Sequence, residues 1–473
     1  MSSFPPPFKA LLISTYELGR QPFGLASPAA WLERAGVDVC CADLSRESLE
    51  PRLVRQADLI AFYVPMHTAT RLAVRLLPGI QELNPSACLC FYGLYAPVNE
   101  AYLRKLGASV ILGGEYEAGL LETVRELCRL KSLGPDREGS REPRADQQVS
   151  PVISLARQQF LTPHRHGLPS LSSYAHLNHP DGKAGVVGYT EASRGCKHLC
   201  RHCPVVPVYQ GRFRVVQRQV VLEDIQQQVE AGAEHITFGD PDFFNGIGHA
   251  LAIVESLHHD HPALTYDVTI KIEHLLKHAR HLTTLRKTGC LFVTSAVESI
   301  DDETLRRLDK GHTRADFLRV VEMLEAEGLG FSPTFIPFTP WTTLEGYLEL
   351  LECLARLGLV EHVAPVQLGM RLLIPAGSKL LELAEVRKIA SEFSEAELVY
   401  PWRHGDPKVD GLCENVQHHL ERHAQDGARR AETFEKIFDL ARQATGAPPQ
   451  RFVGQYVPVA RAAVPYLTEP WYC

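Results

Sequence analysis

The chain has 473 residues, enough for roughly three domains of about 150 residues each. Hydrophobic residues make up 45% and charged residues 22%, which excludes a disordered chain, and the net charge of −7 lacks the basic surplus typical of proteins that bind duplex nucleic acid. No apolar run has the length of a membrane span and the start MSSFPPPFKA does not resemble a signal peptide, so we expect a cytoplasmic protein.

The first 130 residues alternate short apolar runs with amphipathic stretches. Five runs have the length of buried strands: residues 8–15, 37–44, 57–65, 87–94 and 109–114. Alternation of this kind predicts a Rossmann-like domain with a doubly wound parallel sheet over residues 1–130. Ligands of such sheets bind at the carboxyl ends of the strands, where residues 65–67, 93–95 and 113–115 lie; these residues could equally be ordinary turns.

A polar, charged stretch at residues 131–150 is expected to be a linker, and residues 151–185 an irregular approach segment. Six further strand candidates follow, each with a helical stretch after it: residues 186–192, 235–240, 264–273, 290–299, 328–338 and 362–375. They predict a partial (β/α)6 barrel over residues 186–380. Residues 381–473 are expected to be mainly helical, with an irregular tail that ends in Cys473.

Polar side chains gather at the carboxyl ends of the predicted barrel strands, where barrel enzymes carry their sites. They are Asp240, Lys271, Glu273, Glu298, Thr339 and Arg371.

Three of the twelve cysteines lie close together, in the segment SRGCKHLCRHC, as Cys196, Cys200 and Cys203. Three thiolates on one loop can bind three irons of a [4Fe–4S] cluster and leave the fourth iron open. A zinc site closed by His198 or His202 is the alternative, although both histidines lie inside the triple. Three buried cysteines without a metal fit poorly with such polar neighbours. Most of the other cysteines lie in apolar runs and are expected in the core.

A Cys-x3-Cys-x2-Cys motif after the first barrel strand resembles the radical S-adenosylmethionine (radical SAM) superfamily, over residues 186–380. The resemblance implies that SAM chelates the open iron and that one electron from the cluster cleaves a C–S bond of SAM, giving a 5′-deoxyadenosyl radical. His202 departs from the pattern, since an aromatic residue usually stands there, but an imidazole can still pack on adenine.

The same resemblance implies roles for further residues. Gly239 and Asp240 partly match the turn that binds the SAM amine; the alternative for Asp240 is a helix cap, a role that Asp242 and Asn245 could fill instead. Glu298 and Ser299 belong to a stretch that resembles radical enzymes with a cobalamin-type domain, and Glu298 could accept hydrogen bonds from the ribose.

Further charged residues are expected to belong to the site. Arg371 could bind the SAM carboxylate or form an ion pair with Glu273 or Glu298. Asp240, Lys271 and Glu273 are the candidate catalytic residues.

The N-terminal domain resembles the cobalamin-binding domain of that branch, but it lacks the Asp-x-His-x-x-Gly signature whose histidine ligates cobalt. Cobalamin therefore stays an open third cofactor, beside the [4Fe–4S] cluster and SAM.

Several segments together resemble a radical SAM family defined by a C-terminal tail of Cys-Cys-Ala-Glu-Pro, or the same tail with selenocysteine second. The resemblance leads us to expect that the reading frame continues past Cys473 through a selenocysteine codon. A plain C-terminal cysteine is the alternative. Vicinal thiol and selenol groups could reduce, chelate a soft element or quench a radical.

The sequence thus predicts a radical SAM enzyme that acts on a small-molecule or metalloid substrate and takes electrons from a flavodoxin or ferredoxin. Nucleic acid and membrane partners are not expected. The alternatives are a cobalamin-dependent radical methyltransferase, transfer of a 3-amino-3-carboxypropyl group to a soft acceptor such as arsenic, and a non-catalytic iron–sulfur or zinc protein.

Overall fold

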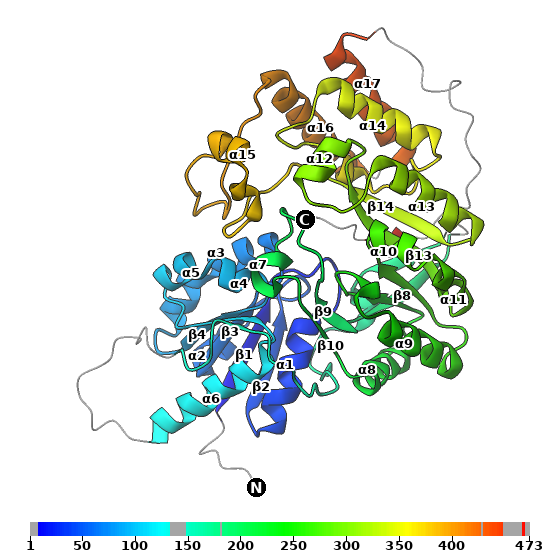
Figure 1. The fold of residues 1–473 in the computed structure, drawn as a ribbon. Helices are drawn as coiled ribbons and strands as arrows, with labels where there is room; N and C mark the ends of the chain where they lie inside the picture. Colours follow the sequence, from blue (N-terminus) through cyan, green and yellow to red (C-terminus); the bar gives the residue numbers. More distant parts are fainter. Residues whose placement is uncertain (1–7, 133–147, 180–181, 427–428, 448–465, 469–473) are drawn as a thin grey trace.

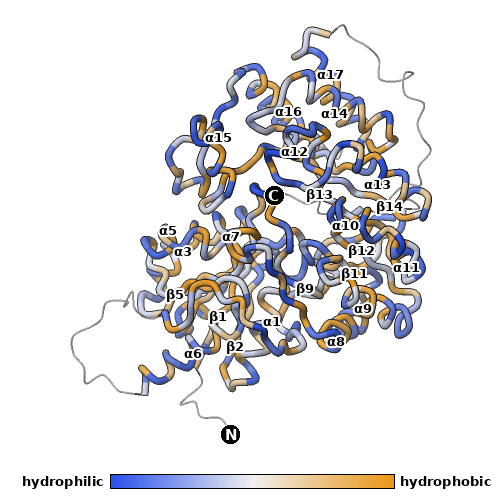
Figure 2. The backbone as a smooth tube through the Cα atoms, viewed as in Figure 1, coloured by the Kyte–Doolittle hydropathy of each residue, from blue (hydrophilic) through white to orange (hydrophobic). Residues whose placement is uncertain are grey.

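The computed structural model describes residues 8–132, 148–179, 182–426, 429–447 and 466–468. Two sheets, each covered by helices, lie side by side, and a helical layer of the C-terminal region packs beyond the second sheet (Figure 1). Hydrophobic residues follow the strands in the interior, whereas the outer helices α14, α16 and α17 alternate between hydrophobic and hydrophilic residues (Figure 2). Among the described residues, none of the helices combines the length and the hydropathy needed to span a bilayer.

The N-terminal sheet confirms the predicted doubly wound fold. Its strands are β1 (Lys9–Ser14), β2 (Asp38–Asp43), β3 (Leu59–Tyr63), β4 (Cys88–Tyr92), β5 (Val110–Gly114) and β6 (Ile153–Ser154), in the order β2-β1-β3-β4-β5-β6. All neighbouring pairs are parallel. The strands are apolar runs because helices cover both faces of the sheet.

Alternate residues of β1 show how this sheet is filled. Ala10 and Leu12 pack with helices α1 (Phe23–Arg34) and α6 (Glu117–Ser132), whereas Leu11 and Ile13 pack with α2 (Pro51–Gln56), α3 (His67–Leu83) and α5 (Glu100–Lys105). Successive side chains of a strand point to opposite faces, so the domain has two cores.

The second sheet contains the five parallel strands β8 (Ala184–Thr190), β11 (His235–Phe238), β12 (Thr265–Thr269), β13 (Cys290–Glu298) and β14 (Gly330–Phe335). Antiparallel β7 (His176–Asn178) and β15 (Tyr466–Leu467) extend its β8 edge. Helices cover its outer face: α8 (Arg218–Glu230), α9 (Ile247–Asp260), α10 (Ile272–Lys277), α11 (Leu282–Lys287) and α13 (Arg314–Ala326) (Figure 1).

The structure differs from the prediction in the sixth barrel unit. Residues 362–375 contain a 3-10 helix, Pro365–Gly369, and a single parallel bridge between Phe338 and Arg371 in place of a strand. Pro365 has no N–H to donate to a neighbouring strand. A Cβ on Gly369 would lie 2.5 Å from Leu420, so α16 packs directly on this segment.

The C-terminal region is mainly helical, as predicted. Its long helices are α16 (Pro407–Asp426) and α17 (Arg430–Thr445), and they pack with α14 (Leu344–Arg356) into the same core as the barrel. The shorter helices are α4 (Tyr95–Val98), α7 (Val205–Tyr209), α12 (Asp302–Arg307) and α15 (Ala384–Ile389). Most of the predicted linker and Cys473 lie outside the described residues, and the boundaries of the predicted domains stay a prediction.

Candidate functional site

The three cysteines lie on the loop between β9 (Ser193–Gly195) and α7. Gly195 has a φ of 77°, and a Cβ there would lie 2.3 Å from the Tyr209 ring, so only glycine turns the chain into this loop. The backbone N–H of Lys197 donates to Asn245 Oδ1 at 3.1 Å, and the N–H of Arg201 donates to the Leu308 carbonyl at 2.9 Å. Contacts with two other loops therefore fix the cysteine positions.

Burial raises the pKa of the Cys196 thiol to about 11 and that of Cys203 to about 12. Cys200 is buried as well. Thiols in such surroundings hold their protons until a metal ion replaces them. The loop thus offers three thiols for an iron–sulfur cluster, that of Cys200 buried and those of Cys196 and Cys203 half-buried.

Glu298, at the end of β13, forms the charged centre beside this loop. Its Oε1 accepts hydrogen bonds from Nε2 of His202 at 3.1 Å and from Nζ of Lys310 at 3.2 Å. Burial opposes the charge of Glu298, but Lys310 and His202 outweigh it and lower the pKa of Glu298 to about 2. The sequence placed His202 and Glu298 in one site, and the structure brings them together.

Glu298 also has a strained backbone. Its φ is 68°, and the register between β13 and β14 shifts between Ala296 and Glu298. A residue other than glycine in the left-handed region costs free energy, and such strain concentrates at functional sites. The bulge turns the carboxylate toward His202 and Lys310.

Lys271 and Glu273 lie beside the same centre, with 3.5 Å between Nζ and Oε2. Oε2 of Glu273 is also 3.5 Å from Nδ1 of His198 in the cysteine loop. Gly311 lies against both charged groups, since a Cβ there would be 2.8 Å from Oε2 of Glu273 and 3.6 Å from Nζ of Lys271. Lys271 is buried, whereas 45% of the Glu273 side chain is exposed, so only the carboxylate faces solvent.

Asp240 is buried and accepts hydrogen bonds from two residues that directly precede the cysteine loop. It accepts from the Ala192 N–H at 2.9 Å and from the Ser193 hydroxyl at 2.5 Å, and burial raises its pKa to about 7. Gly239 lies against Tyr189, whose hydroxyl would be 1.9 Å from an added Cβ. Asp242, and not Asp240, caps the following 3-10 helix, because its side chain accepts a hydrogen bond from the Phe244 N–H at 3.1 Å.

Ser299 and Arg371 are already engaged. The Ser299 hydroxyl accepts from the Asp301 N–H at 3.0 Å. Arg371 donates to Asp410 Oδ1 at 2.8 Å and to the Trp402 carbonyl, and its guanidinium lies 3.8 Å from the centre of the Trp402 ring. An ion pair of Arg371 with Glu273 or Glu298 was one of its two expected roles. Arg371 pairs instead with Asp410 of α16.

The sequence assigned no role to Lys310, His312 or His274, and only that of a helix cap to Asp242. Oδ2 of Asp242 lies 3.2 Å from His198 Nε2 and 2.7 Å from His274 Nδ1. Burial, then Lys310 and Lys271, lower the pKa of His312 to about 4. Lys310 and His312 lie in the segment DKGHT, which follows Glu298 and Ser299 in the stretch that resembles radical enzymes. The sequence does not show which of its side chains point inward, because that depends on the turn after α12.

Arg194, two residues before Cys196, joins the N-terminal domain to the site. It donates to both carboxylate oxygens of Glu117, at 2.7 and 3.0 Å, and to Glu191 at 2.7 Å. The neighbouring Glu115 accepts from the Tyr209 hydroxyl at 3.1 Å, and burial raises the pKa of Glu115 to about 7. The carboxyl edge of the N-terminal sheet therefore meets the cysteine loop directly.

His67 is the only histidine in residues 1–130. Its Nε2 lies 2.5 Å from the Glu397 carbonyl oxygen, so this nitrogen is already engaged. The edge of the sheet thus has no spare histidine of the kind that the missing signature would supply to cobalt.

The residues fit a cluster and a polar ligand next to it. Besides the three thiols, two buried imidazole nitrogens, Nδ1 of His202 and Nδ1 of His312, have no hydrogen-bond partner among the described residues. Buried polar atoms without partners indicate a ligand or water. They adjoin Glu298 and Lys310, so a polar ligand could bind beside the cysteine loop.

Comparisons with known proteins agree with this site. Residues 190–354 match the Radical SAM superfamily. Hopanoid C-3 methylase of Methylococcus capsulatus is 24% identical over 350 residues, which cover 70% of this chain and 64% of the relative. A tRNA-2-methylthio-N(6)-dimethylallyladenosine synthase of Geobacter sulfurreducens is 24% identical over 180 residues, or 35% of this chain and 39% of the relative. The chain thus spans less than two thirds of the length of these curated relatives.

Two solved structures share the arrangement of both domains. The cobalamin-dependent SAM radical enzyme OxsB, bound to aqua-cobalamin and SAM, has a TM-score of 0.64 and 13% identity over 88% of this chain and 67% of its own. The radical SAM methyltransferase TsrM of Kitasatospora setae, with cobalamin and a [4Fe–4S] cluster, has a TM-score of 0.57 and 17% identity over 74% of this chain and 73% of its own. At these identities the likeness concerns the fold. Residues 190–354 thus match a radical SAM domain, a domain of enzymes whose cofactors are a [4Fe–4S] cluster and SAM, and this domain follows the doubly wound N-terminal domain in a fold like that of OxsB and TsrM.

Proposed function

We propose that this enzyme cleaves SAM reductively and abstracts a hydrogen atom from a small-molecule substrate. The observation that supports this reaction is the position of the three-thiol loop beside the buried Glu298, Lys310 and His202. When bound, the cluster on Cys196, Cys200 and Cys203, together with SAM, supplies one-electron cleavage of a sulfonium C–S bond. A flavodoxin or ferredoxin is the proposed reductant.

The chain's own residues orient the cofactor. Glu298 stays ionised and can accept hydrogen bonds from the ribose hydroxyls, with Ser299 next to it. Gly239 and Asp240 form the turn proposed for the amine. Arg371 is bound to Asp410, so the buried Lys310 is the better placed cation for the SAM carboxylate.

Lys271 and Glu273 are the proposed catalytic residues, together with Asp240. Glu273 is the charged group of this set that reaches solvent, so it is the one placed to accept a proton from a substrate entering the site. Lys271, 3.5 Å away, would stabilise its charge.

The test is to reconstitute the protein with iron and sulfide without oxygen, add dithionite and SAM, and identify the products by mass spectrometry. We expect 5′-deoxyadenosine from the wild type, none from Cys200→Ala, and an unchanged yield from Cys40→Ala, a half-buried cysteine of the N-terminal sheet. Formation of 5′-methylthioadenosine would overturn the proposal and indicate transfer of a 3-amino-3-carboxypropyl group instead. Colourless protein with one zinc and no iron would replace it by a non-catalytic zinc protein.

Cobalamin-dependent methyl transfer is the second candidate. It is favoured by the direct contact of the carboxyl edge of the N-terminal sheet with the cysteine loop, through Arg194 with Glu117 and Tyr209 with Glu115. Cobalamin retained on gel filtration, and S-adenosylhomocysteine formed only when cobalamin is present, would establish it.

We also propose that the chain belongs to the radical SAM family with the Cys-Cys-Ala-Glu-Pro or selenocysteine tail, and that its substrate contains a metalloid. The support is the set of segments SRGCKHLCRHCPVVPVY, HITFGDPDFFN and RLLIPAGS. The test adds arsenite to the reaction above, and a new arsenic-containing product, identified by mass spectrometry, is expected.

A further inference from the structure

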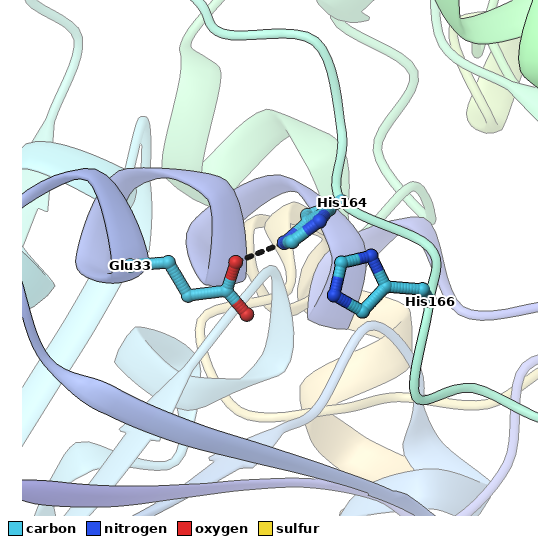
Figure 3. A group of neighbouring side chains, drawn as sticks. All are labelled: Glu33, His164 and His166. Carbon is cyan, nitrogen blue, oxygen red and sulfur yellow. Dashed lines mark ion pairs between the residues drawn. The ribbon is translucent and has the colours of Figure 1, made fainter.

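A second cluster of metal-ligating side chains lies away from the cysteine loop, between the approach segment and α1. Glu33 belongs to the last turn of α1, and His164 and His166 lie in the approach segment just before Gly167. Figure 3 shows the Glu33 carboxylate reaching from the helix toward the two imidazole rings.

The three side chains converge closely. A carboxylate oxygen of Glu33 and one ring nitrogen from each histidine all lie within 4.8 Å of one another. Oε2 of Glu33 forms an ion pair with Nδ1 of His164. The ring centres of His164 and His166 are 3.6 Å apart, with the planes at 82°, so the two imidazoles meet edge to face.

The backbone between the histidines is fixed by Arg165. Its buried guanidinium donates to both oxygens of Asp224, at 2.7 and 2.8 Å, and to Gln21 Oε1 at 2.8 Å. The N–H of His164 donates to the Ala26 carbonyl of α1 at 2.9 Å. The contacts of Arg165 and of the His164 N–H thus fix the chain between the two histidines beside α1.

Two imidazoles and one carboxylate are ligands that zinc and other divalent transition metals prefer. Glu33 and His164 are half-buried, and His166 is exposed, so an ion can enter from solvent. Three ligands from the protein leave coordination positions for water. We propose that Glu33, His164 and His166 bind a divalent transition-metal ion, with zinc as the probe that fits best, and that the ion fastens the approach segment to α1.

The test measures zinc on the protein whose cysteine site is already loaded. The reconstituted holoenzyme is dialysed to equilibrium against zinc chloride, and zinc and iron are measured by mass spectrometry. We expect the wild type to bind about one more zinc than the double variant H164Q/H166Q, with the same iron content. Glu33→Gln is expected to weaken zinc binding at least tenfold, since loss of an outer-shell partner alone costs about 10–100-fold.

A matched control is His418→Gln, an exposed histidine on α16, which should bind as much zinc as the wild type. Zinc should also raise the melting temperature of the wild type and of His418→Gln, and not that of H164Q/H166Q or Glu33→Gln, because a ligand of the folded state stabilises it. If the double variant does not fold, Glu33→Gln still decides. Equal zinc content in the wild type and Glu33→Gln, or an equal loss in His418→Gln, would overturn the proposal.

Discussion

Nζ of Lys310 lies 3.2 Å from Oε1 of Glu298, and only 3% and 7% of the two side chains are exposed. Taking two charges out of water is costly unless each has a partner of opposite sign. Burial lowers the pKa of Lys310, but Glu298 and the nearby Cys200 raise it above its usual value. The pair therefore links the strained end of β13 to the cysteine loop.

Replacing Lys310 by Met should leave the Glu298 charge buried with only His202 beside it. We expect a loss of about 3–5 kcal/mol in the free energy of unfolding, measured with urea at neutral pH. The double variant K310M/E298Q should lose clearly less than the sum of the single losses, because it removes both charges. Additive losses would mean that the two residues do not interact.

The stability of the protein should depend on pH through Asp240. Burial raises its pKa in the folded protein to about 7, whereas an unfolded Asp titrates at about 3.9. Between these values the unfolded chain loses the proton first, so this group destabilises the fold increasingly as pH rises from about 4 to 7. Asp240→Asn cannot titrate and can still pair with Ala192 and Ser193. Its unfolding free energy, relative to the wild type, should rise over this interval and stay level above it.

Arg194 is predicted to hold the two domains together. Arg194→Met would leave Glu117 and Glu191 buried without their cation, and we expect a loss of about 3–5 kcal/mol in unfolding free energy together with reduced iron content. Arg306→Met is the control, because it removes an exposed pair with Glu303 and should change neither quantity. Equal behaviour of the two variants would contradict the prediction.

Gly195→Ala should reduce the iron and sulfide bound per chain. A Cβ at this position would lie 2.6 Å from the Arg212 carbonyl oxygen as well as against the Tyr209 ring, and φ is positive, so the start of the cysteine loop must move. Gly248→Ala on α9 has no atom within 4 Å of the new Cβ and should bind the cluster normally. Full cluster content in Gly195→Ala would show that the loop tolerates the shift.

The sequence predicted those elements whose signal is local. The strands β1 to β5 and the five parallel barrel strands come from short apolar runs of strand length, a pattern that the sequence shows directly. The run at residues 362–375 is equally apolar, but it contains a proline and packs against α16 at Gly369. It forms a 3-10 helix in place of a strand. No local pattern reports such tertiary packing.

The candidate site divides in the same way. Cys196, Cys200 and Cys203 have a specific spacing, so the sequence was enough to identify them. Arg371 was expected inside the barrel, yet it binds Asp410 of α16, some forty residues later, a partner that only the fold brings near. Lys310 was given no role, because the direction of its side chain depends on the bulge at Glu298 and on the turn after α12.

The approach segment has a mechanical consequence. It adds β6 to the N-terminal sheet and β7 to the barrel sheet within 26 residues, from Ile153 to Asn178, so one short stretch is hydrogen-bonded into both. Between these strands the segment is bound to both halves as well, because Arg165 donates to Gln21 of the N-terminal domain and to Asp224 of the barrel, so a movement of one half away from the other would have to break these contacts. The two sheets should therefore melt in a single calorimetric transition, and the molecule should work as one rigid clamp around its cysteine loop, with access governed by side chains and loops instead of a hinge between its halves.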